Sequence, residues 1–594
     1  MANNDDRIKE LKELIKSLPQ GNITYKTIRG ARRMYLGGKY IKAVNENETL
    51  ELVDKRKNAE DELRMLLTNE ANDEKQLFDE VYQYETNVIT GKRLSDMVSV
   101  AGRFKTRECF GRLMKFLDSD VIGKVCLLYG LRRTGKTIML FQAISQYKNE
   151  KCAYIKMMTT DSMAMLNRDL RILSNSGYKY VFIDEITLMS DFIDSASLLS
   201  DVYAMGGMKI VLSGTDSLGF VFSSDEELYD RTVSIHTTFI PFREYASLLG
   251  IHDIDEYIRY GGTFRIGETD FDDDELNDEG ISFRDDESTR RYIDTAIARN
   301  IQHSLACYRD GRHFRHLIDL YEADEFTNAV NRIIEDMNHK FLISVITRDF
   351  KSHDLGSASQ IDRKRTALDG KVSILDYIDK QNVVNKLMNI LEIKNKTELS
   401  VQITQDHVTE IKEYLKMLDL IISYPIESIG TSPSEGVIFA QPGMRYCQAQ
   451  ALVCALMKDE SFRKFPQKDR TIVTNTILEE VRGRMLEEIV LLETMKSTSS
   501  KKRVFKLIFA SGEFDMVIAD ERTLTCEVYE VKHTGNIYAA QYKNLVDEEK
   551  CAVAEHEYGQ ITKKTVLYQG DNTVVDGIDY KNVIQYLEEL GQNN

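Results

Sequence analysis

The chain has 594 residues, of which 42% are hydrophobic and 29% charged, and its formal net charge is −17. A chain of this length is too long for one hydrophobic core, so we expect roughly three or four domains. The acidic balance argues against a broadly basic nucleic-acid-binding surface, although it leaves room for a local basic groove.

Three features predict a cytoplasmic protein without a membrane span. No stretch approaches the roughly 20 consecutive apolar residues that a membrane-spanning helix needs. The first residues, MANNDDRIKELKEL, are charged and lack the apolar core of a secretory signal. The eight cysteines form no CxxC pair, which favours buried thiols in a reducing compartment and predicts no zinc site.

Residues 1–95 predict a small α+β unit. Alternating stretches around Ile23–Tyr25 and Met34–Leu36 indicate a hairpin closed near Gly37-Gly38, and a charged helix follows from about Glu48 to Asn72. Such a unit is typical of a contact with another part of the protein, a second copy of the chain or a protein partner. A few basic residues are either nucleic-acid contacts or solvated charges: Arg29, Arg32, Arg33 and Lys39.

Residues 96–262 predict an α/β core domain. Short apolar runs alternate there with helical patterns, which is typical of a parallel sheet buried between helices. The runs are Val125–Tyr129, Ala153–Met157, Tyr180–Ile183 and Ile210–Leu212.

The first of these runs leads into GLRRTGKT, residues 130–137. A strand that feeds a glycine loop into a helix creates an anion site, because backbone N–H groups and the helix dipole both face the ligand. We expect Lys136 to neutralise the β- and γ-phosphates of ATP and Thr137 to ligate Mg²⁺. The other loop residues expected at the nucleotide are Gly130, Arg132, Arg133, Thr134 and Gly135.

A second motif supports a nucleotide site. The apolar strand that starts at Tyr180 ends in Asp184 and Glu185, which predicts a magnesium ligand followed by the base that activates water. An acid beside the metal ligand indicates the ATPase class with an additional central strand, and no guanine-binding NKxD follows. At the end of the next strand, Ser213 and Thr215 are either residues that orient the attacking water or ordinary turn residues.

The middle of the chain predicts helices and then a winged helix. Residues 263–375 are expected to be helical, with an acidic insertion at 266–288 that predicts a mobile surface segment. Within 376–470, apolar residues recur at helical spacing and two short strand candidates follow, Ile421–Tyr424 and Val437–Phe439. The helical stripe consists of Val408, Ile411, Leu415, Leu418 and Ile421.

Residues of about 110–535 resemble a family of prokaryotic AAA-type ATPases, related to the archaeal ATPases, that carry a C-terminal restriction-endonuclease-like domain. The resemblance includes the loop GLRRTGKT, the strand Ile210–Thr215, the stretch TFIPFREY at Thr238–Tyr245 and the pair Gly261-Gly262. It implies that Arg231 is a phosphate sensor, although Asp230 stands where the family often has glycine.

Residues 471–594 then predict a PD-(D/E)xK nuclease-like domain. Asp515 lies in one predicted strand, and Glu530 and Lys532 share a face of the next, whereas Glu527 has the opposite parity. In this constellation the acids hold magnesium and the lysine positions or activates water beside the phosphodiester. Taken alone, the same residues are also compatible with a charged surface strand pair.

Related nucleases place two further residues at such a site. The helix Leu478–Met495 supplies Glu487 as a third metal ligand, and Gln541 opens the following helix near the scissile phosphate. A basic run is either a phosphate-binding patch or a solvated turn: Lys501, Lys502, Arg503 and Lys506.

Together these features predict an α/β protein with a parallel-sheet P-loop ATPase core, a helical and winged-helix middle, a C-terminal α/β restriction-endonuclease-like domain and a small N-terminal α+β unit. We expect ATP and Mg²⁺ as cofactors, DNA as a partner, and no membrane. The expected function is an ATPase whose nucleotide state controls a magnesium-dependent DNA nuclease. The alternative is an ATP-driven switch whose nuclease-like fold binds DNA or protein without cleavage.

Overall fold

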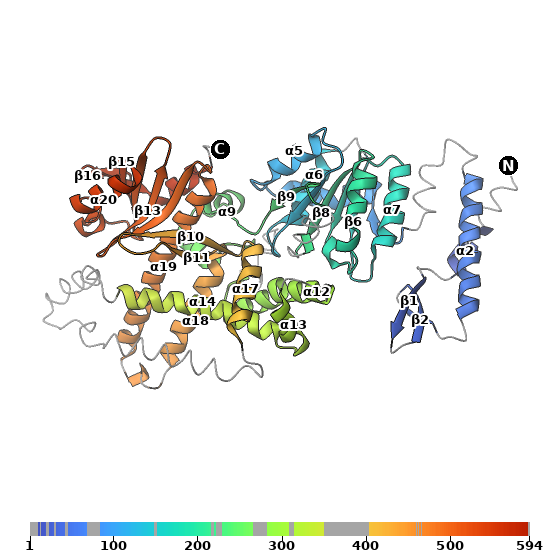
Figure 1. Cartoon of the computed structure of the whole chain (residues 1–594), viewed down its shortest axis with the longest axis horizontal. Coiled ribbons are helices and arrows are strands. Elements are labelled where there is room, and N and C mark those ends of the chain that lie inside the picture. The colour runs from blue at the N-terminus through green and yellow to red at the C-terminus, as the bar shows by residue number, and fades with distance from the viewer. Residues whose placement is uncertain are drawn as a thin grey trace.

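The computed structural model describes residues 10–67, 84–264, 282–349 and 403–591 (Figure 1). Short gaps within these ranges fall at 12, 19–22, 29–30, 38, 42–45, 148–150, 216–218, 221–227, 308–313, 459, 461 and 465. The acidic insertion lies largely outside the described residues. Its last part does not fit the predicted mobile surface, because Ser282 and Phe283 are buried.

The N-terminal unit is a three-stranded antiparallel sheet followed by a long helix, α2 (Glu46–Leu67). The strands are β1 (Ile23–Ile28), β2 (Ala31–Leu36) and β3 (Lys39–Ile41). The predicted hairpin exists, but it closes between Ile28 and Ala31, whereas Gly37 directly follows β2 and lies between the two strands of a second hairpin, β2 and β3. Of the basic residues noted above, Lys39 is exposed, whereas the side chains of Arg29, Arg32 and Arg33 lie outside the described part of the chain.

The ATPase core is a six-stranded sheet in the order β4-β6-β7-β8-β5-β9. All neighbours pair in parallel except β4, and the four predicted strands are confirmed as β5 to β8. Strand β8 lies between β5 and β7, so the additional central strand is present. The strands are β4 (Asn87–Ile89), β5 (Val125–Tyr129), β6 (Cys152–Lys156), β7 (Tyr180–Asp184), β8 (Lys209–Gly214) and β9 (Thr232–His236).

Helices cover both faces of this sheet because its strands are apolar on both sides (Figure 1). They include α4 (Gly91–Val98), α5 (Phe110–Asp118), α6 (Lys136–Gln146) and α7 (Met163–Asn175). Two short helices, α9 (Phe242–Leu249) and α10 (Ile254–Tyr260), follow the last strand and lead away from the sheet.

The helical middle packs on the nucleotide-binding loop. Leu131 of that loop shares a buried core with Phe283, Tyr292 and Ile297. The helices are α11 (Asp286–Tyr292), α12 (Arg299–Cys307), α13 (Arg315–Glu322), α14 (Phe326–Asp349) and α17 (Gln405–Met417). Residues 350–402, which span part of the predicted helical and winged-helix segments, lie outside the described residues.

The predicted wing and the C-terminal segment form one eight-stranded sheet, in the order β11-β10-β12-β13-β14-β15-β17-β16. The wing strands β10 and β11 pair antiparallel as predicted, and β10 also pairs in parallel with β12, with Ile426 opposite Lys506. The strands are β10 (Ile421–Ser428), β11 (Ser434–Phe439), β12 (Lys502–Ile508), β13 (Glu513–Asp520), β14 (Thr525–Val531), β15 (Gln560–Tyr568), β16 (Thr573–Val575) and β17 (Ile578–Asn582).

One hydrophobic core joins this sheet to the ATPase part. It contains Phe242 and Tyr257 from α9 and α10, Leu452 from α18 (Pro442–Lys458), Leu486 from α19 (Gln467–Ser497) and Tyr529 from β14. Helix α19 includes the predicted helix Leu478–Met495. Among the described helices, none combines the length and apolar character needed to cross a membrane.

The pairing of β10 with β12 makes a testable prediction about fragments. A fragment of residues 471–594 leaves the β12 edge unpaired and exposes the apolar surface that α18 covers, so we expect it to aggregate or to unfold at low temperature. A fragment of residues 403–594 retains β10, β11 and α18, and its Tm should be higher by several degrees. Thermal unfolding followed by circular dichroism compares the two, and equal Tm values would show that β10 adds no stability to the sheet.

Candidate functional site

The loop between β5 and α6 has the backbone that an anion cradle requires. Gly130 has φ 149°, and a Cβ there would lie 2.4 Å from Thr237 Oγ1. Gly135, directly before α6, has φ 84°. Only glycine adopts both conformations without strain, so the two glycines allow the loop to curl around the amino end of α6.

Lys136 lies buried inside this curl. Its Nζ donates hydrogen bonds to the carbonyl oxygens of Gly130 at 2.7 Å and Leu131 at 2.8 Å. Burial lowers the pKa of Lys136 to about 8, although Glu185 and Asp184 act in the opposite direction. A polyphosphate would give the ammonium far stronger acceptors than the two carbonyls, so the side chain is held ready for an anionic ligand.

Asp184 and Thr137 form the pair that a magnesium ion needs. Thr137 Oγ1 donates to Asp184 Oδ2 at 3.1 Å, and Tyr154 and Lys156 donate to the same oxygen. The other oxygen, Oδ1, is buried and accepts no hydrogen bond of good geometry from the described residues, although the Ser213 hydroxyl lies nearby. A free carboxylate oxygen beside a hydroxyl fits Mg²⁺ by the chemistry of its donors.

The ionisation of Asp184 also suits a metal ligand. Burial works to raise its pKa, but the charge of Lys156 and the hydrogen bonds to the carboxylate outweigh burial, so the pKa lies below its usual value. Asp184 is therefore a carboxylate at neutral pH.

Glu185 has a left-handed backbone, and its side chain contacts Thr215 and not the partners of Asp184. The φ of Glu185 is 58°. Its Oε2 accepts hydrogen bonds from the N–H and hydroxyl of Thr215 at 3.3 and 3.2 Å, and Asn300 of α12 donates to the Thr215 carbonyl. Because the helical middle contacts Thr215, a movement of α12 changes the support of the glutamate.

Arg107 is a buried residue of the site that the sequence analysis did not identify. Its guanidinium forms two hydrogen bonds with Glu244 and donates to the carbonyl oxygens of Thr134 at 2.7 Å and Thr237 at 2.8 Å. The glutamate of FREY therefore fixes an arginine that supports the P-loop. A buried acid in that motif was the signal that could have pointed to such a partner.

Arg231 does not lie at the phosphates, so the prediction of a phosphate sensor is wrong for this conformation of the chain. Its carbonyl accepts a hydrogen bond from Val125 N, at the start of β5, whereas the P-loop follows the end of that strand. Its side chain pairs with Asp201 on the surface.

The two loop arginines have different surroundings. Arg133 donates to Ser282 Oγ at 3.0 Å, and the carbonyl of Arg132 accepts a hydrogen bond from the Tyr292 hydroxyl. These contacts join the loop to Ser282, in the last part of the acidic insertion, and to Tyr292 of α11.

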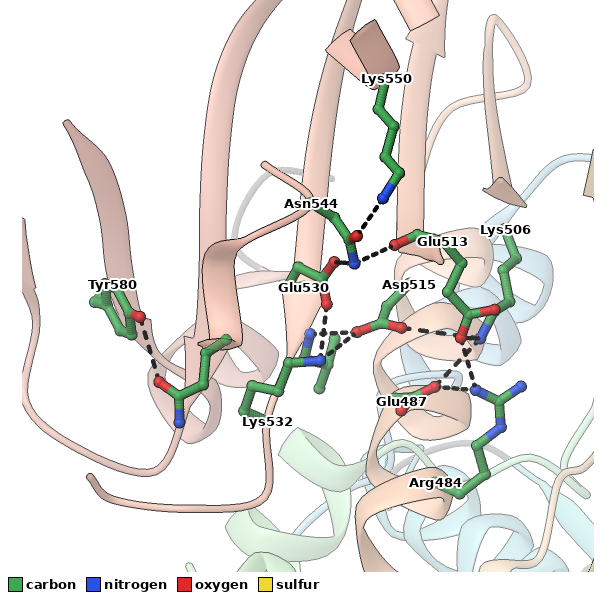
Figure 2. A network of polar contacts seen from close by, with 12 residues as sticks. Arg484, Glu487, Lys506, Glu513, Asp515, Glu530, Lys532, Asn544, Lys550 and Tyr580 are labelled. Carbon is green, nitrogen blue, oxygen red and sulfur yellow. Dashed lines mark hydrogen bonds and ion pairs between the residues drawn. The ribbon is translucent and has the colours of Figure 1, made fainter. Parts of the chain in front are cut away.

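The C-terminal site lies where β13 begins and β14 ends. Met516 pairs with Tyr529, so Asp515 and Glu530 lie one step further along the two antiparallel strands. Lys532 Nζ lies 3.2 Å from Asp515 Oδ2 and 2.7 Å from Glu530 Oε2, and Figure 2 shows the three side chains pointing toward one another. Asp515 Oδ2 also accepts the Val531 N–H, and Asn544 donates to Glu530 Oε1 at 2.9 Å.

Four further charged residues complete this cluster, and the sequence analysis did not single out two of them, Glu513 and Arg484. Glu487 of α19 lies beside Glu513 and Asp515, and one oxygen from each lies within 4.8 Å of the others. Lys506 and Arg484 form ion pairs with Glu487 and Glu513 (Figure 2). Glu513 precedes Asp515 by two residues, so the parity argument used for Glu530 and Lys532 could have found it.

The buried charges alter one another's protonation. Burial raises the pKa of Glu530, and Lys532 and Asn544 oppose that shift. Burial alone would raise the pKa of Asp515 as well, but Lys532 and Lys506 hold it well below its usual value. Lys532 has a pKa well above its usual value, because its two carboxylate neighbours outweigh the cost of burial. Asp515 and Lys532 are therefore a charged pair at neutral pH.

Two sequence predictions near this cluster are corrected. Gln541 does not open an α-helix: it lies in a short 3-10 turn, where its side chain accepts from Tyr538 N and donates to the Asn536 carbonyl. The basic run is not one surface patch, because Lys506 is buried in the carboxylate cluster and Arg503 pairs with Glu427.

Parts of the chain are similar to known proteins. Residues 123–246 match the family of AAA domains. The chain is 23% identical over 240 residues to an uncharacterized protein of Methanocaldococcus jannaschii, and the match covers 36% of this chain and 51% of the relative. The chain thus spans about half the length of the curated relative that it matches.

A solved structure of the ORC1 protein of Aeropyrum pernix in complex with DNA aligns with 61% of this chain and 94% of that one. The sequence identity is 14% and the TM-score is 0.21, so no conclusion about this chain rests on the alignment. The family match and the P-loop sheet together show an AAA-type ATPase core, and such a core is expected to bind ATP.

Replacement of Lys136 with alanine tests the phosphate site. Removal of a buried ammonium that faces the phosphates costs about 3 kcal/mol or more, which is at least roughly 100-fold in ATP affinity. Titration calorimetry with ATP measures the loss, and Lys151→Ala, at a surface position of the same domain, is the control. Unchanged affinity in Lys136→Ala would show that ATP binds elsewhere.

Replacement of Glu185 with glutamine separates binding from hydrolysis. The amide retains the shape and the contacts to Thr215 but cannot accept the proton of water, so turnover should fall by roughly 100-fold or more while ATP affinity stays within about threefold. Phosphate release under saturating ATP measures the rate. A Glu185→Gln variant that hydrolyses ATP at the wild-type rate would exclude this glutamate as the base.

Proposed function

We propose that this protein is an ATP-hydrolysing switch whose nucleotide state controls a magnesium-dependent DNA nuclease in the C-terminal part of the same chain. The observation that carries the proposal is the convergence of Asp515, Glu530 and Lys532 from adjacent strands with Glu487 from α19. A strand pair built only for stability gains little from so many buried carboxylates, because burial of each charge is costly.

In this proposal the residues of the cluster have different roles in phosphodiester cleavage. Asp515 and the neighbouring glutamates would hold Mg²⁺, which supplies a water of lowered pKa and neutralises charge on the phosphate. Lys532 lies between Asp515 and Glu530, where its ammonium can orient that water toward phosphorus. Carboxylate oxygens are the ligands that Mg²⁺ prefers, so the donor set fits the ion.

The control by ATP is supported by a chain of contacts from the P-loop to α19. Arg107 holds the Thr134 carbonyl and Glu244, and the next residue, Glu108, forms two hydrogen bonds with Arg243. Arg243 also reaches Ser497 at the end of α19.

The far end of this chain of contacts lies on the helix that carries Glu487. The Phe242 N–H donates to the buried Glu493 of α19, and burial raises the pKa of that carboxyl to about 8. A shift of α9 on ATP binding would therefore be transmitted to α19 through groups buried between the two.

The second candidate is a nuclease-like domain that binds DNA or protein without cutting. Its specific support is that Lys506 and Arg484 already neutralise Glu487 and Glu513, so the cluster is compatible with a purely structural ion network.

Cleavage of supercoiled plasmid by the full chain distinguishes the two candidates. With Mg²⁺ and ATP we expect nicked product from the wild type. Asp515→Asn should reduce the rate by at least about 100-fold, because changes outside the ligand shell already cost 10- to 100-fold in metal affinity. Glu527→Gln is the matched control: this acid is on β14, the strand of Glu530, accepts from the Tyr529 hydroxyl instead of joining the cluster, and should leave cleavage unchanged. No cleavage by the wild type would favour the second candidate.

Replacement of Arg243 with alanine tests the control by ATP. Hydrogen exchange of residues 486–497 should change when the wild type binds a non-hydrolysable ATP analogue, and the change should vanish in Arg243→Ala, while ATP affinity persists. Arg503→Ala, an exposed arginine paired with Glu427, is the control. An undiminished response in Arg243→Ala would rule out this route.

A further inference from the structure

Lys506 occupies the middle of the carboxylate cluster. Its Nζ lies 2.7 Å from Glu513 Oε1, 3.3 Å from Glu487 Oε2 and 3.9 Å from Asp515 Oδ1. These are the same three carboxylates whose oxygens are close enough to hold one metal ion. The side chain is only 3% exposed, so these carboxylates take the place of water as partners of its ammonium.

The backbone around Lys506 favours this placement. Phe505 and Leu507 on either side of it both face one apolar core, so the alternation of the strand directs Lys506 to the opposite face. The pairing of β12 with β13 shifts register at this point, where Lys506 stands opposite two residues of β13, Asp515 and Met516. A β-bulge redirects side chains of the strand that carries the extra residue, which is here the strand of Asp515.

An ammonium and a divalent cation at this point compete for the same oxygens. Two like charges about 3 Å apart in a poorly hydrated site repel strongly. Arg484, which also contacts Glu487 and Glu513, adds a further positive charge at the edge of the cluster. The lysine and the metal ion therefore cannot both occupy the centre of the three carboxylates.

We propose that Lys506 is an internal counter-ion that closes the carboxylate site to divalent cations, and that a metal ion enters when the Lys506 ammonium withdraws. The inference rests on the proposed function in taking this cluster as the metal site of the nuclease. The flexible four-carbon stem allows the ammonium to leave without a change in the strand. Since Glu487 is on α19, a shift of that helix widens the cluster and weakens the hold on Lys506.

Titration of the full chain with Mn²⁺ tests the proposal without relying on cleavage. In Lys506→Met the three carboxylates lose their internal cation, so Mn²⁺ should bind at least about tenfold more tightly than in the wild type. Arg503→Met, on the same strand but exposed, should match the wild type. Each titration is repeated on a variant that also carries Asp515→Asn. This substitution removes Mn²⁺ binding at the C-terminal site, so the remaining Mn²⁺ binding is that of the ATPase site.

Thermal unfolding gives a second readout. Without metal, Lys506→Met should have a lower Tm than the wild type because its carboxylates repel, and Mn²⁺ should raise that Tm by more than it raises the wild-type value. Equal Mn²⁺ affinity in a folded Lys506→Met would overturn the proposal. Failure of both Lys506→Met and Lys506→Gln to fold even with Mn²⁺ would also overturn it, because the metal should replace the lost charge.

These results are separable from those of the plasmid assay. If the wild type cleaves DNA while Lys506→Met gains no affinity for Mn²⁺, the role of Lys506 is refuted and the nuclease stands. If Lys506→Met gains affinity while no variant cleaves DNA, Lys506 is the counter-ion of a metal site that is not a nuclease.

Discussion

The buried ion pair between Arg107 and Glu244 is the contact on which the arrangement of the two halves depends. It ties a carbonyl of the P-loop to the first turn of α9, and α9 packs in the same core as α19 and the C-terminal sheet. Loss of either partner would leave a buried charge without compensation, which is far more costly than loss of a surface pair. The ATPase core and the C-terminal sheet are therefore coupled by groups that cannot separate without a large penalty.

Helix α19 is the structural element that extends this coupling to the carboxylate cluster. It has 31 residues and is about 46 Å long at the usual rise per residue. Glu493 and Ser497 near its end contact α9, and Glu487, which contributes to the cluster, lies about two to three turns before them. Because both sets of contacts lie on the same helix, the proposed control by ATP needs only a displacement of the last part of α19.

The sequence predicted elements well where a single apolar pattern decides the structure. Strands β5 to β8 of the ATPase sheet, the helix of the winged segment and the β13–β14 hairpin follow from local periodicity, whereas β4 lies in the range 1–95 that was assigned to the N-terminal unit. Local patterns could not show that β10 pairs with β12, because that contact joins residues about 80 apart and depends on the packing of α18 and α19. The same limit explains why the sequence analysis placed the wing strands, at 376–470, in a different domain from the C-terminal sheet.

The sequence predicted some of the site residues and missed others for the same reason. Lys136, Thr137, Asp184 and Glu185 lie next to a strand end, so their positions follow from the motif. Arg107 acts through a partner 137 residues away, so a lone basic residue in an ordinary segment gives no sign of its role. Lys506 was noted only as part of a basic run, because its burial among carboxylates depends on the packing of α19 against the sheet. Arg231 was misplaced because a resemblance fixed its strand but not the end of the sheet at which it lies.

The central claim is that the nucleotide state changes the C-terminal site. The most direct test is the Mn²⁺ affinity of that site, taken as the difference between the wild type and Asp515→Asn, with and without a non-hydrolysable ATP analogue. The structure predicts that the analogue changes this affinity by at least about fivefold, the lower range of coupling between sites. Equal affinity in the two nucleotide states would contradict the claim.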